Sequence, residues 1–197
     1  MKSLKGTRTL TNLMIAFAGE SQARNRYVFY ASKARKDGYK QIEAIFTETA
    51  ANEKEHAERF YDLMLEGLDG MLPAEVEITG GFPVAKGETL ANLEAAADGE
   101  KFEWSELYLE SEKVAREEGF GEIAEAFKHI AMVEAKHEYR YRKLAENIKN
   151  GLVFKREQVT RWKCSNCGYV HEGTTAPDLC PACKHPKDYY ELYVEAY

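Results

Sequence analysis

The sequence predicts a mainly α-helical protein, in which a four-helix bundle with one long crossover precedes a small cysteine-rich domain. Three observations favour this fold class. Apolar residues recur at helical spacing over four long segments. Residues 69–88, between the second and third segments, contain both proline and Gly-Gly, which interrupt helices. All four cysteines follow residue 160, where tryptophan, tyrosine, glycine and proline also become frequent.

Glycine-containing turns separate the helical segments. The helices are expected over residues 9–37, 40–66, 89–118 and 122–149. The short turn at Gly38 makes the first two antiparallel neighbours, and residues 69–88 are long enough to cross from one end of the bundle to the other. Thr89 is the predicted N-cap of the third helix, which is expected to pause at Asp98-Gly99. A helix pair, a crossover and a second helix pair form the layout of ferritin-like bundles.

Composition excludes several classes of protein. The chain of 197 residues is 44% hydrophobic and 30% charged, which is ordinary for a soluble protein of one or two domains. A net charge of −6 and the lack of a basic run argue against nucleic-acid binding. We find no signal peptide and no apolar run long enough for a membrane span, so we expect a cytoplasmic protein. The expected domains are residues 1–152 and 153–197.

Glutamates fall in the middle of the apolar helix stripes. They are Glu20 on the first helix, Glu53 on the second, Glu100 and Glu103 on the third, and Glu134 on the last. Arg24 and Glu110 also fall on these stripes. Glu-x-x-His occurs twice, ending at His56 and His137, but this pattern alone decides nothing because glutamate is abundant here. The alternative for any one glutamate is a misjudged helix face, or a side chain that reaches the rim.

The five glutamates also lie at matched depth. Each is 15 to 19 residues from the nearest helix turn, which places all five roughly 22–28 Å along the bundle. Five buried carboxylates would repel one another unless protonated or bound to metal. Two ferrous ions, or two ferric ions with one oxide, reduce five negative charges to one. Carboxylate and imidazole ligands suit iron or manganese, so we expect a two-metal site with His56 and His137.

The cysteines form two closely spaced pairs. They are Cys164, Cys167, Cys180 and Cys183. Two C-x-x-C pairs indicate a tetrahedral four-thiolate metal site, whereas disulfides do not suit a cytoplasmic chain. The spacing alone favours structural zinc. A redox-active two-metal site in the same chain needs an electron source, which favours a single iron instead. His171 and His185 are not expected to be ligands, because the cysteines already fill four positions.

With both sites in place, the chain resembles the rubrerythrin family over essentially its whole length. The resemblance rests on Glu20 followed by Tyr27, on both Glu-x-x-His motifs, on "GEKFEW" with Glu100 and Glu103 followed by Tyr108, and on the "CSNCGY…CPAC" tail. It implies a ferritin-like di-iron bundle with a C-terminal rubredoxin-like domain. One departure is Lys184, which stands after Cys183 where rubredoxins usually have glycine.

The resemblance implies a peroxidase that reduces hydrogen peroxide to water in oxygen-sensitive cells. NADH would be the ultimate electron donor, through rubredoxin or a separate NAD(P)H-dependent reductase. Glu53 would bridge the two irons, while Glu103 and His56 would exchange as ligands of one iron when its oxidation state changes. Tyr27 and Tyr108 would donate hydrogen bonds to ligand carboxylates, although ordinary core tyrosines explain them equally well.

Two other functions stay open, together with the mode of assembly. The chain could be an iron-oxidising or iron-storing protein, or an interaction scaffold with a structural zinc ribbon. Lys149 lies 12 residues beyond His137, so the bundle ends about 18 Å from the metal level. Nothing in the linker demands a return along the same bundle. We therefore expect a head-to-tail homodimer in which electrons cross between subunits.

Overall fold

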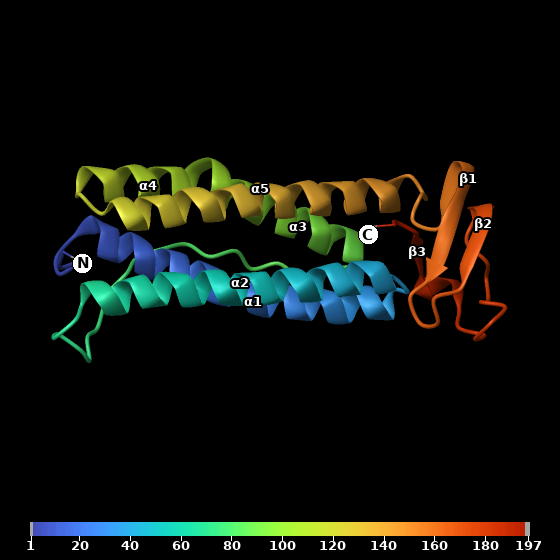
Figure 1. The fold of residues 1–197 in the computed structure, drawn as a ribbon, viewed down its shortest axis with the longest axis horizontal. Coiled ribbons are helices and arrows are strands. Elements are labelled where there is room, and N and C mark those ends of the chain that lie inside the picture. The colour runs from blue at the N-terminus through green and yellow to red at the C-terminus, as the bar shows by residue number, and fades with distance from the viewer. Residues whose placement is uncertain (1, 196–197) are drawn as a thin grey trace.

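The computed structural model describes residues 2–195 and has a helical bundle with a small sheet domain at one end (Figure 1). The bundle consists of α1 (Arg8–Lys36), α2 (Lys40–Gly67), α3 (Thr89–Phe102), η1 (Glu103–Leu107), α4 (Tyr108–Glu117) and α5 (Gly121–Lys149). The second domain consists of β1 (Lys155–Cys164), β2 (Val170–Thr175), η2 (Lys187–Tyr189) and β3 (Tyr190–Leu192). Within residues 2–195, no helix combines the length and apolar character that a membrane span requires.

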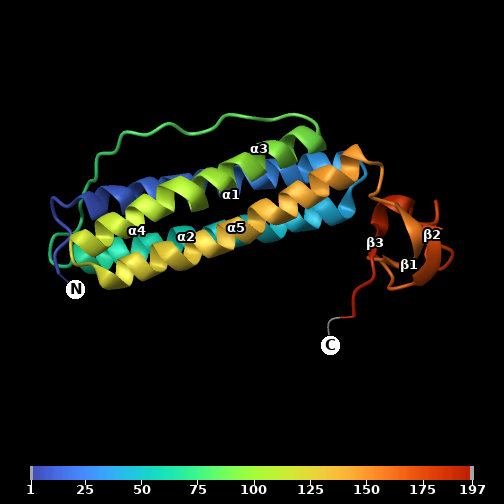
Figure 2. The same cartoon turned by 90° about the horizontal axis from the view of Figure 1, so that it is seen from above.

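The bundle is made of two helical hairpins. α1 packs chiefly against α2, and α3 and α4 pack against α5. Each hairpin turns at a glycine with a left-handed backbone, Gly38 and Gly119, both with φ of 82°. This conformation is costly for residues with a Cβ, which explains glycine at these two turns. Residues 68–88 run along the outside of the bundle between the hairpins, as the predicted crossover (Figure 2).

Each hairpin turn caps the first helix of the other hairpin. The Glu118 carboxylate accepts hydrogen bonds from the Thr9 N–H (2.9 Å) and hydroxyl (2.6 Å). In the same way, Asp37 accepts from the Thr89 N–H (3.1 Å) and hydroxyl (2.6 Å). The prediction that Thr89 is an N-cap was therefore wrong: Thr89 is already helical, and Asp37 from the other hairpin satisfies its N–H. These two sets of contacts join the hairpins to each other, one set at each end of the bundle.

The third helix is irregular, but not where the sequence predicted. α3 continues through Asp98-Gly99 without a pause. Instead, η1 is a π-helical turn in which the Tyr108 N–H donates to the Glu103 carbonyl, five residues earlier. A single glycine costs a helix only about 1 kcal/mol, so buried neighbours can hold α3 together across Gly99. A π turn contains one extra residue and shifts the buried face of all that follows.

That shift corrects two assignments made from ideal helical periodicity. Glu110 lies seven residues after Glu103 and would share its face in a regular helix. After the π turn Ser111 is buried instead, and Glu110 is exposed. Arg24, also predicted on a core stripe, is exposed on α1, about 40° around the helix from Glu20. Neither charged side chain belongs to the core.

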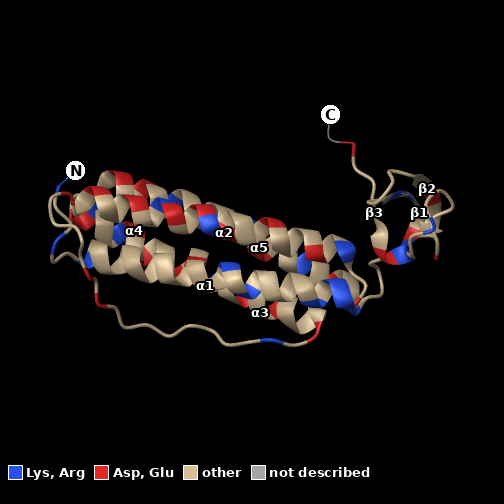
Figure 3. Cartoon of the chain, turned by 90° about the horizontal axis from the view of Figure 1, so that it is seen from below, with Lys and Arg blue, Asp and Glu red and all other residues tan. Residues whose placement is uncertain are grey.

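The core of the bundle consists of two apolar clusters, one toward each end. One contains the contacting rings of Phe60, Tyr108 and Phe127. The other contains those of Tyr27, Phe46 and Tyr141. Figure 3, in which the ribbon is coloured by residue type, shows acidic and basic residues interspersed along the helices.

The C-terminal domain is a three-stranded antiparallel sheet that packs against the end of its own bundle. The strand order is β2-β1-β3, and Trp162 and Tyr190 are buried in its small core. Phe154 stacks on Tyr39 at the α1–α2 turn, with ring centroids 6.2 Å apart. The Lys40 ammonium lies 5.2 Å from the centre of the Tyr189 ring. The domain is therefore a cap on one end of the bundle (Figure 1).

Candidate metal centre

All five predicted glutamates are buried in the bundle. Glu20 and Glu134 are 0% exposed, Glu53 and Glu100 1%, and Glu103 9%. They come from all the long helices, and from η1 in the case of Glu103. Carboxylates are almost never fully buried unless they are paired or bound to a cation. Their burial therefore requires compensating positive charge at this level of the bundle.

The side chains form two groups of four whose ligand atoms lie within 4.8 Å of one another. The first group is Glu20, Glu53, His56 and Glu134, and the second is Glu53, Glu100, Glu134 and His137. Glu53 and Glu134 belong to both groups. Each group thus has one histidine and one glutamate of its own, with the two shared carboxylates between them. This arrangement suits two adjacent metal ions bridged by carboxylates.

The donor atoms lie close together but do not satisfy one another. The Nδ1 of His56 lies 2.9 Å from a Glu134 oxygen and 3.0 Å from a Glu53 oxygen. The Nδ1 of His137 lies 2.8 Å from Glu134 and 3.2 Å from Glu53. Despite these distances, both Nδ1 atoms and all four oxygens of Glu53 and Glu134 lack a partner with hydrogen-bond geometry. Buried donor atoms that converge without bonding one another fit metal ligands better than a hydrogen-bond network.

The carboxylates carry strongly perturbed acidities. Burial, followed by repulsion from neighbouring carboxylates, raises the pKa of Glu20 and Glu103 well above the usual value. Burial likewise raises the pKa of Glu100. Burial also acts to raise the pKa of Glu134, but the imidazoles on either side outweigh it and lower the pKa to about 2. The glutamates thus differ in acidity according to how much positive charge they face.

The two histidines supply positive charge when protons are the only cations present. Burial acts to lower the pKa of His56, but Glu134 and Glu53 raise it to about 9. For His137 the carboxylates of Glu100, Glu134 and Glu53 overcome burial and raise the pKa to about 12. Metal ions bind deprotonated imidazole, so they would displace these protons and take over the same electrostatic role.

Two buried tyrosines donate hydrogen bonds to Glu20 and Glu100, the outer carboxylates, each of which belongs to only one ligand group. The Tyr27 hydroxyl donates to Glu100 and the Tyr108 hydroxyl to Glu20, both at 2.5 Å. Each tyrosine reaches across to a glutamate of the other hairpin. A hydrogen bond to the far oxygen of a ligand carboxylate fixes its orientation and tunes its basicity. The contacts fit the supporting role predicted for both tyrosines.

Glu103 stands apart from the other site residues. Among residues 2–195, it belongs to neither four-residue group, whereas His56 does. It remains close enough to Glu134 and Glu53 for their charge to raise its pKa. One oxygen, Oε1, lies 3.7 Å from where a Cβ on Gly19 would stand. The exchange of Glu103 and His56 as ligands stays a prediction.

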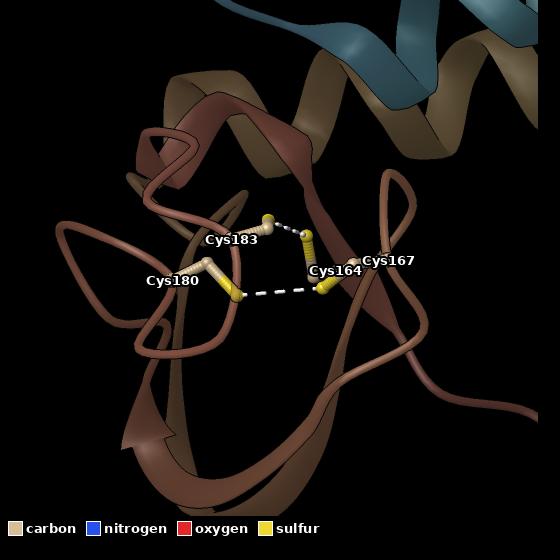
Figure 4. Close-up of side chains that lie close together, drawn as sticks. All are labelled: Cys164, Cys167, Cys180 and Cys183. Carbon is tan, nitrogen blue, oxygen red and sulfur yellow. Dashed lines mark hydrogen bonds between the residues drawn. The ribbon is translucent and has the colours of Figure 1, made fainter.

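The four cysteines meet in the C-terminal domain (Figure 4). The sulfurs of Cys164 and Cys183 are 3.8 Å apart, and those of Cys167 and Cys180 are 3.6 Å apart. A tetrahedron of thiolates about 2.3 Å from a central ion has edges of about 3.8 Å, so the spacing fits one metal ion.

Two similar turns present the sulfurs. Gly168 N–H donates to the Cys164 carbonyl, and Lys184 N–H donates to the Cys180 carbonyl. Gly168 and Lys184 have left-handed backbones with φ of 81° and 61°. Lys184 thus adopts the conformation that glycine would favour at this position. The His185 N–H is the main cause that lowers the pKa of Cys183 to about 6, which favours the thiolate that binds metal.

Comparison with known proteins agrees with both sites. The Rubrerythrin family model matches residues 11–145, and the model named "Rubrerythrin, rubredoxin-like domain" matches residues 162–191. The chain belongs to the rubrerythrin family. It is 54% identical to Rubrerythrin-1 of Clostridium acetobutylicum over 100% of both chains. The Glu/His cluster accordingly fits a di-iron site of ferritin-like proteins, and the cysteines fit a rubredoxin-like knuckle.

Solved structures support the ferritin-like bundle of this rubrerythrin family member. A partially reduced nigerythrin superposes with a TM-score of 0.63 at 31% identity, covering 98% of this chain and 92% of that one. A bacterioferritin of Desulfovibrio desulfuricans, described with a diiron site, superposes with a TM-score of 0.64 at 25% identity. The superposition covers 74% of this chain and 82% of that chain.

Sequence reasoning missed an internal repeat that relates the two hairpins of this chain. Glu20 and Glu53 are 33 residues apart, and Glu100 and Glu134 are 34 apart. Each Glu-x-x-His glutamate lies 15 residues after the turn glycine of its hairpin, Gly38 or Gly119. These similar spacings were visible in the sequence, and they relate the ligands in one hairpin to those in the other.

The one-residue difference between the repeats lies before the second turn. Tyr27 follows its hairpin's first glutamate by seven residues, whereas Tyr108 follows Glu100 by eight. The π turn of η1 lies within that interval and takes up the extra residue. It thereby returns Tyr108 to the core. No local pattern in "EWSEL" would have predicted the π turn itself.

Proposed function

We propose that the protein reduces hydrogen peroxide to water at a di-iron site, with electrons supplied through the four-cysteine iron. The supporting observation is that one chain combines the buried Glu/His cluster with a four-cysteine site in a rubredoxin-like domain. Family membership supports a redox role. A purely structural zinc ribbon would leave the cluster without an electron source in the same chain.

Within this proposal, each site residue has a distinct role. Glu53 and Glu134 would be the ligands shared by the two ions, because both belong to both ligand groups. Glu20 with His56, and Glu100 with His137, complete the two ends. The hydrogen bonds from Tyr27 and Tyr108 hold the outer carboxylates in place. The surrounding aromatic clusters exclude water, which strengthens every charge interaction in the site.

The reaction needs two electrons and two protons for each peroxide. When bound, two ferrous ions would supply the electrons that cleave the O–O bond. The protein must supply the protons from the solvent side of the cluster. His56 has 13% of its side chain exposed, and Glu103 is the least buried of the five glutamates. These two residues are therefore the proposed path for protons into the site.

We also propose that His56 and Glu103 serve as alternative ligands. His56 completes the first ligand group, and Glu103 lies just outside it. The net charge of the site would depend on which of the two is bound, because imidazole is neutral and carboxylate is anionic. Ferric iron favours the anionic oxygen, while ferrous iron accepts imidazole more readily. Such an exchange would keep the charge of the site close to constant through the reaction.

Electron delivery favours a path between subunits. The C-terminal domain packs at the start of α2, and Glu53 lies 13 residues further along that helix. The cysteine site is therefore about 20 Å or more from the cluster in its own chain. Tunnelling rates fall exponentially with distance. A head-to-tail homodimer would bring the cysteines of one chain against the bundle of the other.

Subunit mixing tests this arrangement. One chain would carry Cys164→Ser with Cys180→Ser, and the other Glu53→Ala with Glu134→Ala. Each parent homodimer should be inactive, while mixed dimers should recover part of the activity because one intact pairing of sites survives. Mixed dimers that are confirmed by mass spectrometry but remain inactive would show that electrons do not cross between subunits in this way.

Several finer features belong to the same proposal. The donor would be a rubredoxin or an NAD(P)H-dependent reductase, and the protein would act in the cytoplasm of oxygen-sensitive cells. The proposed domains are 1–152 and 153–197. The linker between α5 and β1 supports this boundary, because the packed bundle ends at Lys149 and the sheet begins at Lys155.

One titration tests the proposed reaction. Protein purified without oxygen should contain about three irons per chain, and after reduction it should consume hydrogen peroxide rapidly. A cysteine-free variant retains only the two-electron cluster, so it should consume one equivalent in a single turnover. The alternative is a ferroxidase, which the likeness to a bacterioferritin bundle favours. In that case oxygen and added ferrous iron would react faster than peroxide, and zinc at the cysteines would not impair the reaction.

A further inference from the structure

A cavity connects the outside of the bundle to one residue of the metal cluster. It has a volume of about 260 Å³ and lies between the crossover, α1, α3 and η1. Phe82 of the crossover and Phe102 of α3 line it, together with Gly19 and Arg26 of α1. Glu103 forms part of its wall. The cavity therefore reaches a cluster carboxylate directly.

Helical glycines keep this cavity open. A Cβ on Gly19 would stand 3.7 Å from Glu103 Oε1, in contact with the carboxylate. Gly99 also lines the cavity, and a Cβ there would meet nothing within 4 Å. Glycine inside a helix costs about 1 kcal/mol relative to alanine. A side chain at Gly19 would therefore contact Glu103, and a side chain at Gly99 would enter open space at the cavity wall.

Exposure of the cluster agrees with access from this side. Glu103 is 9% exposed, whereas Glu20, Glu53, Glu100 and Glu134 are 1% exposed or less. The volume would hold about nine water molecules at about 30 Å³ each. It lies below the range of roughly 300–1,000 Å³ for sites that enclose drug-sized ligands. Its size therefore suits a small molecule.

We infer that this cavity is the access route by which small peroxides reach the cluster, and that Phe82 and Phe102 exclude bulkier hydroperoxides. Phe82 is half-buried and Phe102 is 50% exposed, so both rings stand at the boundary between the cavity and solvent. Phe82 belongs to a crossover segment that also contains Gly80 and Gly81 in the cavity lining. The substrate selectivity in this inference rests on the proposed peroxidase function, whereas the route itself does not.

Two variants test the route from opposite directions. Gly99→Leu places a side chain in open space within the cavity and should obstruct it. Lys101→Leu makes a similar change at an exposed position of the same helix that does not line the cavity, and serves as the control. Phe82→Ala should widen the cavity. Metal content and the absorption spectrum of the iron-loaded proteins should match wild type, which shows that the cluster itself is intact.

Two measurements separate the route from the reaction. The first is the stopped-flow rate at which azide, a small metal-binding anion, binds to the iron-loaded protein. The second is the rate of peroxide consumption with hydrogen peroxide and with cumene hydroperoxide. Gly99→Leu should slow azide binding and hydrogen peroxide consumption at least tenfold, while Lys101→Leu changes neither by more than twofold. Phe82→Ala should raise the rate with cumene hydroperoxide relative to hydrogen peroxide at least fivefold.

The outcomes distinguish the two proposals. If wild type consumes no peroxide but azide binding slows only in Gly99→Leu, the peroxidase function fails and the access route stands. If wild type is an active peroxidase and both rates in Gly99→Leu stay within twofold of wild type, the route is wrong. An unchanged preference in Phe82→Ala overturns the assignment of Phe82 as a size filter, even where Gly99→Leu blocks access.

Discussion

Removal of the metal ions is expected to make the stability of the bundle fall as pH rises. Burial acts to lower the pKa of His56, but Glu134 and Glu53 raise it from 6.5 to about 9. Since the folded-state pKa is the higher one, the stabilisation from His56 is fully present below pH 6.5. It is lost as pH rises from 6.5 through 9, because the unfolded chain has released a proton that the native chain still holds.

The size of the effect follows from that retained proton. One proton held only by the native state lowers the free energy of unfolding by about 1.4 kcal/mol for each pH unit. For a chain of this size, each kcal/mol corresponds to about 2–4 °C in melting temperature, so His56 alone is expected to contribute about 3–6 °C per pH unit to the slope. His137 acts in the same direction, because its pKa is also raised, to about 12.

The assay is thermal unfolding of chelator-treated protein between pH 6.5 and 9, followed by circular dichroism at 222 nm. This signal reports mainly the helical bundle. His56→Gln should flatten the slope, whereas His129→Gln should not, because the His129 side chain is 67% exposed. Comparison of each variant with wild type at the same pH cancels the titration of the metal-free cysteines. Metal-loaded protein should show a much shallower dependence.

Two results would refute this reasoning. One is a melting temperature of the metal-free protein that stays constant or rises between pH 6.5 and 9. The other is an equal change of slope in the His56 and His129 variants. Either would mean that the buried carboxylates do not hold a proton on the imidazole of His56, and hence that the cluster is not as closely packed as the structure shows.

Three further substitutions have distinct expected outcomes. His56→Ala should fold normally but slow peroxide turnover, and normal turnover by the reduced variant would contradict the exchange of ligands. Pre-reduced Cys180→Ser protein should still consume one equivalent of peroxide rapidly, but its steady turnover with an external electron donor should fail. Unimpaired steady turnover would show that electrons enter the protein elsewhere. Tyr108→Phe removes the donor to buried Glu20 and should cost about 1–3 kcal/mol in denaturant unfolding, whereas Tyr61→Phe at an exposed position should cost much less.

Helical periodicity and distance along the bundle were sufficient to place the buried glutamates. The apolar stripes of α1, α2 and α5 follow regular helices, so the angular position of Glu20, Glu53 and Glu134 could be read from spacing. The distance of each glutamate along the bundle could be counted from the turn glycines, because both hairpins turn within a few residues. The C-x-x-C pairs were equally informative, since four sulfurs at this spacing have few other arrangements.

The third helix was less predictable, because its irregularity depends on tertiary contacts. An ideal helix through Glu103 places Glu110 inside, and the π turn moves it out. Asp98-Gly99 resembles a break, but packing against α5 keeps α3 continuous. The docking of the C-terminal domain was also not predicted. It depends on surface contacts such as Phe154 with Tyr39, which leave no periodic pattern in the sequence.

The sharing of Glu53 and Glu134 between the ligand groups has a consequence for maturation of the protein. Each group takes three residues from one helical hairpin and one from the other, so neither hairpin alone offers a complete set. Ions can be held fully only after the crossover has brought the two halves together. Complete binding of the ions would therefore depend on assembly of the two hairpins. Ions bound by both groups would link the two hairpins at the centre of the molecule.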